Sequence, residues 1–347
     1  MIDSPGNLCV LRLSAIGDIC HTLPVVRTLQ DRWPDTHITW IIGRLEHQLV
    51  GDIPGIEFIV FDKRAGLAGY RELARRLKGR RFDALLHMQV ALRASIASLA
   101  VKAPLRLGFD RARARDWQWL FTNREIPAHP RQHVMDGLFG FAEALGVPRG
   151  AVRWDIPIPD DAREFAARHL DAPTLVISPC SSQRSRNFRN WPVERYVALA
   201  RHAITKHGMR VLLTGGPTEL ERGYGAAIQR ELPACVNLIG QTSLKQLLAL
   251  LEGAAVLVSP DSGPVHMANA VGTPVIGLYA TSNPDRTGPY YGREWVVNRY
   301  PDALRKFLDR SVDEVRWGAR VRSPDAMDLI TVDDVTGKLD TLMESRA

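Results

Sequence analysis

The sequence has few cysteines and no long apolar run, and both absences exclude classes of protein. Its 347 residues include only four cysteines, none in a Cys-x-x-Cys pair: Cys9, Cys20, Cys180 and Cys235. That scatter excludes a disulfide framework and a zinc cage, and it fits a reducing cytoplasm. No stretch approaches the roughly 20 apolar residues that cross a bilayer, and the N-terminus lacks the layout of a secretion signal. We therefore expect a cytoplasmic protein that does not span a membrane.

Several motifs that mark known catalytic or nucleotide sites are also absent. The chain has no Walker loop, no G-x-S-x-G elbow, no H-E-x-x-H helix and no D-x-D motif. Because many nucleotide-sugar enzymes hold a divalent metal with D-x-D, a departing diphosphate would here be neutralised by helix N-termini and cationic side chains. The absence of G-x-G-x-x-G disfavours a dehydrogenase. The sequence thus predicts neither a metal nor a cofactor.

The net charge is modest and is concentrated in one half of the chain. The sequence has 45 Lys and Arg against 38 Asp and Glu, a formal charge of +7, of which residues 1–150 carry +6 and the remainder +1. This excess fits an enzyme with an anionic partner and falls short of the dense basic blocks of a nucleic-acid binder. Two regions of the first half are crowded with basic residues, for which a solvated helix face is the plain alternative to a binding role. They contain Lys63, Arg64, Arg71, Arg75, Arg76, Lys78, Arg80 and Arg81, and Arg106, Arg111, Arg113 and Arg115.

Short β-branched runs alternate with longer stretches of helical period, which is the pattern of α/β units around parallel sheets. The Pro- and Asp-rich stretch near residues 150–172 predicts a linker between two doubly wound halves that face each other. The predicted strands are Cys9–Leu13, His37–Ile42, Glu57–Phe61, Asp83–Met88, Arg106–Phe109, Thr174–Ser178, Met209–Thr214, Val236–Ile239, Val256–Ser259 and Pro274–Tyr279. The predicted helices are Thr22–Trp33, Leu67–Leu77, Leu92–Val101, Val134–Leu145, Val193–Lys206, Glu219–Leu232, Leu244–Glu252 and Val265–Val271. Ligands bind beyond the carboxyl ends of such strands, so the turns there are the candidate sites.

The first of these turns runs from Leu13 into a helix through Ser14, a glycine and Asp18. Asp18 is either an N-cap of that helix or a general base at the mouth of an interdomain cleft, where its carboxylate would accept a hydroxyl proton. One residue can serve both purposes, so the turn leaves both interpretations open.

The strongest local signal is Asp261-Ser262-Gly263-Pro264, which follows an apolar strand. A proline near the start of a helix leaves free backbone N–H groups at the helix N-terminus, and that geometry binds phosphate. The alternative is a tight strand-to-helix turn without a ligand. We expect His266, about one turn into the helix, to line the site.

Two further turns offer a carboxylate and cations. Gly215-Gly-Pro-Thr-Glu219 places Glu219 in the first turn of a helix, where it either complements the helix dipole or accepts ribose hydroxyls. The segment 178–192 contains Arg184, Arg186 and Arg189, whose guanidinium groups match phosphate oxygens. A solvated basic loop is the alternative for that segment.

Four motifs, in their order along the chain, resemble glycosyltransferase family 9, the bacterial ADP-heptose:lipopolysaccharide heptosyltransferases. They are Ser14-Ala-Ile-Gly-Asp18-Ile-Cys-His-Thr-Leu-Pro24, Arg189-Asn-Trp-Pro192, Gly215-Gly-Pro-Thr-Glu219 and Asp261-Ser-Gly-Pro-Val-His266. The resemblance spans nearly the whole chain. The stretch His21-Thr-Leu-Pro24 is more similar to heptosyltransferase I than to heptosyltransferase II.

The resemblance implies a GT-B fold, which is α/β, with two Rossmann-like, doubly wound domains that face an interdomain cleft. We expect an acceptor-binding domain at residues 1–160, a nucleotide-sugar-binding domain at 161–325, and a C-terminal helix within 326–347, at Thr331–Met343, that packs back on the first domain. The resemblance also implies metal-independent, inverting transfer of L-glycero-D-manno-heptose from ADP-heptose to a Kdo sugar of the lipopolysaccharide inner core.

The resemblance further assigns roles to single residues. Asp18 matches the catalytic base, and Arg189 stands where the family typically has Lys, in a loop that is about three residues longer. Arg keeps the positive charge but changes its shape and hydrogen bonding. The donor side comprises Ser181, Ser182, Glu219, Thr242, Asp261, Ser262, Gly263 and His266. On the acceptor side we expect Ser14, Gly17, His21, Arg64 and Arg113.

The expected acceptor is a Kdo-bearing lipid A, which implies a peripheral protein on the inner face of the cytoplasmic membrane. Basic residues of the first half would meet the carboxylates and phosphates of that lipid or of the anionic membrane surface, at on the order of 1 kcal/mol each. We expect no nucleic-acid partner, because the basic runs lack interleaved aromatics. The alternatives are a family 9 transferase with another heptose acceptor or another nucleotide-sugar donor, and a nucleotide-sugar 2-epimerase, which shares the GT-B architecture.

Overall fold

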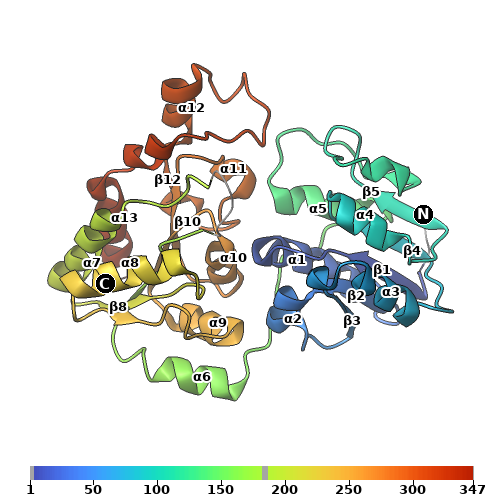
Figure 1. Cartoon of the computed structure of the whole chain (residues 1–347), viewed down its shortest axis with the longest axis horizontal. Coiled ribbons are helices and arrows are strands. Elements are labelled where there is room, and N and C mark those ends of the chain that lie inside the picture. The colour runs from blue at the N-terminus through green and yellow to red at the C-terminus, as the bar shows by residue number, and fades with distance from the viewer. Residues whose placement is uncertain (1–3, 182–186, 347) are drawn as a thin grey trace. The chain divides into compact units, whose positions relative to one another are not determined.

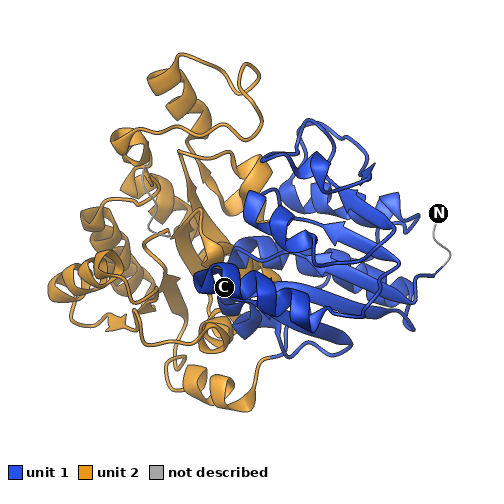
Figure 2. Cartoon of the chain, turned by 45° about the vertical axis from the view of Figure 1, so that its right-hand side comes forward, with its two compact units in different colours: residues 1–157 blue, residues 158–347 orange. Residues whose placement is uncertain are grey.

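The computed structural model describes residues 4–181 and 187–346. Ser182, Arg184 and Arg186, singled out above, lie outside the described residues. The chain divides into two compact units, unit 1 at residues 1–157 and unit 2 at residues 158–347 (Figure 2). The sequence places this boundary between residues 160 and 161.

Unit 1 contains a six-stranded parallel sheet in the order β3-β2-β1-β4-β5-β6 (Figure 1). Its strands are β1 Asn7–Leu11, β2 His37–Gly43, β3 Ile56–Phe61, β4 Ala84–His87, β5 Leu105–Gly108 and β6 Arg124–Glu125. Its helices are α1 Ile16–Arg32, α2 Arg44–Val50, α3 Leu67–Arg76, α4 Leu92–Ser98 and α5 Val134–Ala144, with the short 3-10 helices η1 Lys63–Ala65 and η2 Gln118–Leu120. The central strand is buried on both faces, as a parallel sheet covered by helices requires, and Leu8–Leu11 have no exposed surface.

Unit 2 repeats this plan with the strand order β12-β11-β10-β7-β8-β9. Its strands are β7 Thr174–Ile177, β8 Arg210–Leu213, β9 Val236–Asn237, β10 Val256–Pro260, β11 Val275–Tyr279 and β12 Val297–Asn298. Its helices are α6 Asp160–Ala167, α7 Val193–His207, α8 Glu219–Glu231, α9 Leu244–Gly253, α10 Gly263–Ala270, α11 Pro284–Thr287, α12 Tyr300–Leu308 and α13 Val332–Glu344, with η3 Arg293–Trp295 and η4 Pro324–Leu329.

Both sheets have the same topological switch point. In unit 1 the chain builds outward from β1 to β3 and then crosses to β4 on the other side of β1. In unit 2 it builds outward from β7 to β9 and then crosses to β10. Doubly wound sheets bind ligands beyond the carboxyl ends of the strands at this point, so the turns after β1 and β4 and after β7 and β10 are favoured.

The predicted strands are all present, with ends shifted by at most two residues, whereas several helices differ from the prediction. Helix α1 begins at Ile16 and not at Thr22, and Pro24, a residue typical of a first helical turn, lies inside it. Helices α2, α11 and α12 were not predicted, and neither were the two-residue strands β6 and β12. Helix α6 lies inside the stretch expected to be a linker, because Asp160 and Asp161 in its first turn favour a helix start after the prolines.

The C-terminal helix α13 corrects one expectation. Its apolar residues Val335, Leu339 and Leu342 recur at helical spacing and are buried in the core of unit 2, together with residues of α7 and β11. Next to this apolar face, Asp340 accepts hydrogen bonds from His202 and His207 of α7, at 2.7 and 2.6 Å. The helix that was expected to pack back on the first domain therefore buries its apolar residues within unit 2.

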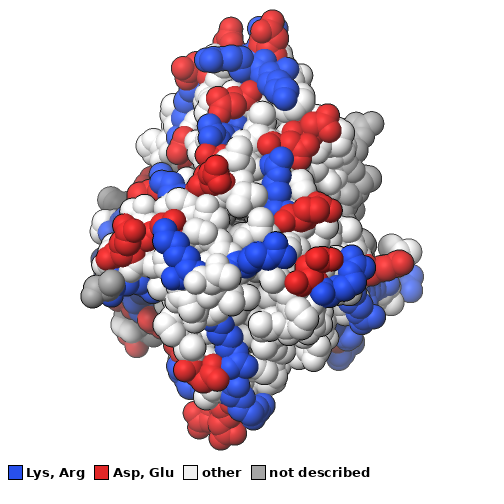
Figure 3. Space-filling model, turned by 90° about the vertical axis from the view of Figure 1, so that its left-hand side faces the viewer, with Lys and Arg blue, Asp and Glu red and all other residues white. Residues whose placement is uncertain are grey.

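The surface has mixed charge on the face that Figure 3 shows, where Lys and Arg alternate with Asp and Glu. Neither sign forms a continuous field there. Within residues 4–181 and 187–346, no helix combines the length and apolarity needed to cross a membrane.

Candidate functional site

Asp18 lies at the carboxyl end of β1, in the first turn of α1. Ala15, not Asp18, is the N-cap, and Asp18 Oδ2 accepts a hydrogen bond from the backbone N–H of Ala15 over 3.0 Å. The other oxygen, Oδ1, lies 2.6 Å from Nη2 of Arg12. Because the Asp18 side chain is 37% exposed, its carboxylate is held from two sides and still reaches solvent.

Arg12 is the buried cation of this turn, with only 8% of the residue exposed. Besides Asp18, its guanidinium donates to the carbonyl of Ser14 at 3.1 Å and to the carbonyl of Met88, just after β4. The indole N–H of Trp40 donates to the backbone carbonyl of Arg12 at 3.2 Å. A fixed guanidinium beside a carboxylate favours the ionised form of that carboxylate. The turn therefore presents a partly exposed carboxylate, paired with a fixed cation, on a rigid support.

Gln89, which follows β4, closes the same turn from the other side. Its Oε1 accepts a hydrogen bond from the backbone N–H of Leu13 over 2.7 Å, and its Nε2 donates to Ser14 Oγ over 3.4 Å. Since β1 and β4 flank the switch point of the sheet, these contacts lie where an α/β sheet binds ligands.

A second carboxylate, that of Glu46, is buried next to this turn. Glu46 lies in the first turn of α2 and is 4% exposed, and burial raises its pKa. Its packing explains Gly43: a Cβ at that position would lie 2.3 Å from the carbonyl oxygen of Leu13 and 2.4 Å from Glu46 Oε2. The end of β2 is thus packed against the end of β1 through a glycine and a buried acid.

Three of the residues expected on the acceptor side belong to this turn or to α1. Ser14 bonds to Gln89, and Gly17 precedes Asp18 in the first turn of the helix. His21 is buried one helical turn beyond Asp18, and its ring meets the ring of His133 edge-on at a centroid distance of 5.2 Å.

The two arginines expected on the acceptor side lie elsewhere in unit 1. Arg113 is half-buried, pairs with Asp110 and donates to the carbonyl of Pro127 over 2.6 Å, so its donors stabilise its own loop. Arg64 is exposed in η1, after the edge strand β3, and its backbone N–H donates to Asp62. Neither arginine belongs to the turn that holds Asp18.

In unit 2, Asp261 and Arg189 form a buried ion pair at the carboxyl end of β10. Nη1 of Arg189 lies 3.2 Å from Asp261 Oδ2 and 2.8 Å from the backbone carbonyl of Asp261. The two side chains are only 14% and 9% exposed. The hydroxyl of Ser282, after β11, also donates to Asp261 Oδ2, over 2.8 Å. The carboxylate of Asp261 is therefore occupied by a cation and a hydroxyl.

Hydrogen bonds within the loop after β7 hold Arg189 in position. Asn187 Oδ1 accepts hydrogen bonds from Arg189 Nε at 3.3 Å and from Ser181 Oγ at 2.9 Å. The backbone N–H of Ser181 donates to Asn190 Oδ1 over 2.9 Å. The structure thus brings Ser181 and Arg189, predicted in one turn, and Asp261, predicted in another, into one hydrogen-bonded chain.

A row of hydroxyls links the strand ends beneath this chain. Ser178 Oγ and Thr214 Oγ1 are 2.6 Å apart, Ser259 Oγ donates to the carbonyl of Ser178 over 2.9 Å, and Ser259 and Ser262 hydroxyls are 2.8 Å apart. Ser262 is the N-cap of α10, with extended backbone and no side-chain bond to the helix amides. The Ser262 side chain therefore does not cap the N-terminal amides of α10, which can donate hydrogen bonds to an anion.

Glu219 and Glu221 have different environments although both lie in the first turn of α8. Glu221 accepts a hydrogen bond from the backbone N–H of Gly216 at 2.8 Å and from the hydroxyl of Thr218 at 2.6 Å, so it stabilises the turn. Glu219 is the first residue of the helix and is exposed. The site carboxylate available to a ligand on this turn is therefore that of Glu219.

The remaining donor-side residues lie on the same edge of the sheet. Thr242 is half-buried just before α9, next to the N-cap Ser243. His266 is 7% exposed, one turn into α10. Together with Glu219 they border the ends of β8, β9 and β10 in unit 2.

The one group of potential metal ligands found in the described part of the chain lies away from these turns. Ligand atoms of His202, His207 and Asp340 fall within 4.8 Å of one another. The group lies between α7 and α13, beside the start of β8 and thus at the amino edge of the sheet. Lys206 Nζ is 2.8 Å from Asp340 Oδ2, so a cation already neutralises this carboxylate.

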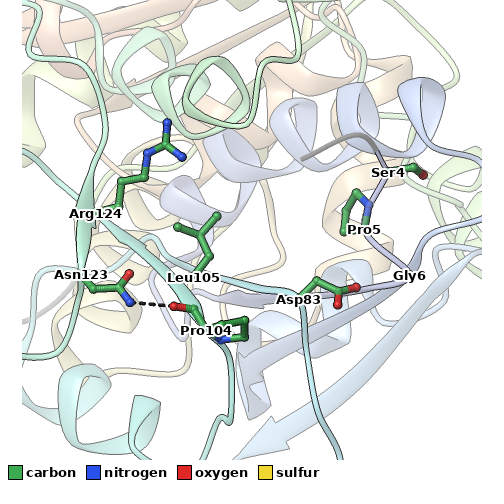
Figure 4. A pocket seen from close by; sticks show the side chains of 8 residues that line it. All are labelled: Ser4, Pro5, Gly6, Asp83, Pro104, Leu105, Asn123 and Arg124. Atoms are coloured by element: carbon green, nitrogen blue, oxygen red, sulfur yellow. Dashed lines mark hydrogen bonds between the residues drawn. The ribbon is translucent and has the colours of Figure 1, made fainter. Parts of the chain in front are cut away.

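A hollow in unit 1, shown in Figure 4, lies at the amino edge of its sheet, opposite the carboxyl edge that holds the candidate turns. It is bordered by Ser4, Pro5, Gly6, Asp83, Pro104, Leu105, Asn123 and Arg124. These residues are at or just before the amino ends of strands. Asp83 accepts from the backbone N–H of Asn7, and Asn123 donates to the carbonyl of Pro104, so their polar groups stabilise the strand starts.

The sequence missed several residues of both sites for one reason. These residues contact their partners across turns or from neighbouring strands, and no local sequence motif predicts those contacts. They are Arg12, Gln89, Asn187 and Ser282. The one available signal was Arg12 itself, a cation at the end of an apolar strand, because a charged side chain there needs a partner.

Comparisons with known proteins point to one family. Residues 70–312 match the family model described as "Glycosyltransferase family 9 (heptosyltransferase)". The chain is 40% identical over 346 residues to the "Lipopolysaccharide core heptosyltransferase OpsX" of Haemophilus influenzae, and the match covers 98% of each chain.

Two solved structures have a similar fold. A family 9 glycosyl transferase from Veillonella parvula superposes with a TM-score of 0.78 at 23% identity and covers 99% of both chains. The E. coli heptosyltransferase WaaC with ADP has a TM-score of 0.75 at 18% identity, over 97% of this chain and 99% of that chain. These matches confirm the predicted α/β fold class, GT-B with two Rossmann-like units.

Proposed function

This chain belongs to glycosyltransferase family 9 (heptosyltransferase), and we propose that it transfers heptose from ADP-heptose to a Kdo sugar of the lipopolysaccharide inner core. The name of the Haemophilus relative supports the lipopolysaccharide core as the product. The ADP named with the E. coli structure supports an ADP-linked donor. The first-half charge supports an acidic acceptor sugar on a phosphorylated lipid.

The observation that carries the proposal is the environment of Asp18. A general base must be ionised, must be accessible to the hydroxyl it deprotonates, and must be fixed in position. Asp18 has the cation of Arg12 at 2.6 Å, the Ala15 N–H at 3.0 Å and an exposed fraction of 37%. It lies at the switch point of its sheet, where ligands bind.

The proposed reaction is a single displacement. Asp18 takes the proton from the acceptor hydroxyl while that oxygen forms a bond to the anomeric carbon. The bond from the anomeric carbon to the diphosphate oxygen breaks on the opposite face, so the anomeric configuration inverts. The products are the heptosylated acceptor, ADP and the proton that Asp18 later releases to water.

The departing diphosphate gains negative charge, which residues of unit 2 offset in this mechanism. Arg189 is a fixed cation at the β10 turn, and the N-terminal amides of α10 add a positive dipole end. Asp261 positions Arg189 through two contacts, at 3.2 and 2.8 Å. Since the carboxylate of Asp261 is already bound by Arg189 and Ser282, we propose that the diphosphate is neutralised without a divalent metal.

The donor side is completed by residues on neighbouring turns. We propose that Glu219 accepts the ribose hydroxyls, that Thr242 and His266 border the nucleotide, and that Ser181 lies near the diphosphate. The acceptor side is proposed to include Ser14, Gly17 and His21 beside Asp18. Arg64 and Arg113 are proposed to meet the acidic groups of the acceptor from outside this turn.

One experiment tests the whole proposal. The protein is incubated with ADP-heptose and vesicles that contain Kdo-bearing lipid A, in the presence of EDTA, and ADP release and lipid mass are followed. We expect stoichiometric ADP and a mass gain of one heptose, with an inverted anomeric linkage by NMR. No transfer to Kdo, but transfer to an acceptor that already carries heptose, would identify a later step of the same pathway. Consumption of the donor without any acceptor would instead point to an epimerase or hydrolase.

A further inference from the structure

Helix α4 of unit 1 presents its apolar side to solvent. Leu92, Ile96 and Leu99 lie on one face at helical spacing and are 40%, 40% and 66% exposed. The opposite face, which packs on the sheet, consists of small residues: Ala94, Ser95, Ala97 and Ser98. A surface helix of a globular protein normally has the reverse arrangement, with its large apolar residues inside.

The outward orientation of α4 is fixed by contacts on its inner face and at its end. His87, at the end of β4, bonds through Nε2 to Ser95 Oγ at 3.1 Å, and burial lowers the pKa of His87 to about 3, so the histidine stays neutral. Arg106 donates to both the carbonyl and the hydroxyl of Ser98, each at 2.9 Å. The exposed leucines are therefore not the result of a loosely attached helix.

A second apolar segment is tied to the start of α4. The carboxylate of Asp116 accepts a hydrogen bond from the backbone N–H of Leu92 over 3.3 Å, and the fully buried Gln118 donates to the carbonyl of His87 over 2.8 Å. Trp117, between Asp116 and Gln118, is 58% exposed, and Leu120, two residues after Gln118, is 72% exposed. We call Leu92, Ile96, Leu99, Trp117 and Leu120 the α4–η2 patch.

The segment that carries this patch is rich in basic residues. Residues 91–124 contain seven basic residues and only two acidic ones, and of these two Asp110 is buried and paired with Arg113. Four of the basic residues are exposed next to the patch in sequence: Arg93, Lys102, Arg111 and Arg115. Apolar side chains within a basic surface match the chemistry of an anionic bilayer, whose phosphates lie above an acyl interior.

We propose that the α4–η2 patch is the surface by which unit 1 docks on an anionic lipid bilayer, with the patch in the headgroup–acyl boundary and the exposed basic residues of the same segment among the phosphates. A second copy of the chain is the less suitable occupant, since two such surfaces would bring their own cations face to face. This proposal rests on the proposed function in one respect: docking would bring the protein to an acceptor carried by a lipid.

The position of the patch within unit 1 suits that purpose. Helix α4 begins three residues after Gln89, the side chain that holds the turn of Asp18 through Leu13. Docking through α4 would place the carboxyl edge of β4, and with it Asp18, near the membrane surface. A sugar attached to a lipid headgroup could then reach the base without leaving the bilayer.

The test is flotation of the full-length protein with vesicles that contain no acceptor. We expect binding to phosphatidylcholine vesicles with about 30% phosphatidylglycerol, weak binding to phosphatidylcholine alone, and loss of binding as salt rises. A triple variant, Leu92→Ser with Ile96→Ser and Leu99→Ser, should bind at least tenfold more weakly. The matched control, Leu220→Ser with Leu308→Ser, removes leucines that are 36% and 44% exposed in unit 2 and should bind as the wild type does.

Two further measurements separate the possible outcomes. Quenching of tryptophan fluorescence by brominated lipid should diminish in a Trp117→Phe variant, because Trp117 would enter the lipid. The triple variant should keep its melting temperature and its activity on a water-soluble Kdo acceptor, while its activity on vesicle-borne acceptor falls.

Docking is overturned if the wild type does not bind anionic vesicles or if the triple variant binds like the wild type. It is also overturned if the triple variant loses only self-association, which would make the patch an interface between copies. Vesicle binding without any glycosyl transfer would leave docking intact and would reject the proposed function.

Discussion

Arg12 and Asp18 are joined at the end of β1, with Nη2 of the arginine 2.6 Å from Oδ1 of the aspartate, although one residue is buried and the other reaches solvent. The buried partner is anchored by carbonyls of Ser14 and Met88, so it holds the exposed partner in place. This arrangement fits a catalytic carboxylate that reaches solvent from a rigid scaffold. The roles of Asp18 and of Arg12 can be tested separately.

The first test replaces the base. Asp18→Asn keeps an oxygen that can accept from Ala15 but removes the negative charge, so proton transfer from the acceptor is lost. We expect kcat to fall by about 10²–10⁴-fold, the usual contribution of general base catalysis. ADP affinity, measured by calorimetry, should change less than twofold. Near-normal turnover in Asp18→Asn would eliminate Asp18 as the base.

The second test replaces the support. Arg12→Met removes the cation that favours ionised Asp18, so the acid limb of the pH–rate profile should move to higher pH and kcat should fall about tenfold or more. It also leaves the carbonyls of Ser14 and Met88 without a donor, at a cost of about 1–3 kcal/mol in unfolding free energy. Arg12→Lys keeps a charge and should restore most of the pH profile. An unchanged profile in a folded Arg12→Met protein would show that Arg12 is only structural.

The sequence could predict Asp18 but not Arg12, and the reason is physical. A carboxylate in the first turn of a helix after an apolar strand is a local pattern, and strand ends are where α/β sheets bind ligands. The partners of Arg12 include a carbonyl 76 residues away, which only the pairing of β1 with β4 brings close. Contacts of that kind depend on tertiary structure.

The helical spacing of apolar residues likewise does not show which part of the protein those residues contact. The stripe of Val335, Leu339 and Leu342 in α13 shows that one face is buried but not what buries it, and the structure places it in the core of unit 2. In α4 the apolar period of Leu92, Ile96 and Leu99 predicts the helix correctly. Large apolar residues at helical spacing usually face the core, whereas here the small residues opposite them pack on the sheet.

The buried pair of Arg189 and Asp261 predicts a difference between two substitutions. Arg189→Lys retains a cation but cannot contact Asp261 and Asn187 through two separate donor groups as Nη1 and Nε do, so we expect a tenfold to hundredfold loss of kcat with a stable fold. Arg189→Ala leaves Asp261 buried with only the Ser282 hydroxyl, and it should lower the unfolding free energy by about 3–5 kcal/mol. Urea unfolding and steady-state kinetics measure the two effects. Equal stability of both variants would contradict this interpretation of the pair.

The turn before α8 provides a matched pair of glutamates. Glu219→Gln changes an exposed side chain, so ADP affinity should fall about tenfold while the melting temperature stays within 1–2 °C. Glu221→Gln weakens the bonds to Gly216 and Thr218 and should lower stability by about 1 kcal/mol, with a smaller effect on ADP binding. Calorimetric titration with ADP and thermal melting separate the two. The assignment of Glu219 to the ribose fails if ADP binds equally well to its variant.

The attachment of α13 to α7 predicts a pH dependence of stability. Burial raises the pKa of Asp340, but hydrogen bonds from Lys206, His202 and His207 outweigh that effect and hold the pKa well below its usual value. An acid with a lowered pKa stabilises the fold at pH values above its unfolded pKa of about 3.9, and this contribution is lost as the pH falls toward the lower folded pKa. Asp340→Asn should therefore cost about 1–2 kcal/mol at pH 7, as expected for charge-assisted bonds of a partly exposed group. The difference between wild type and variant should shrink in urea unfolding below pH 4, and a difference that is the same at pH 7 and pH 3 would exclude the charge of Asp340 as its source.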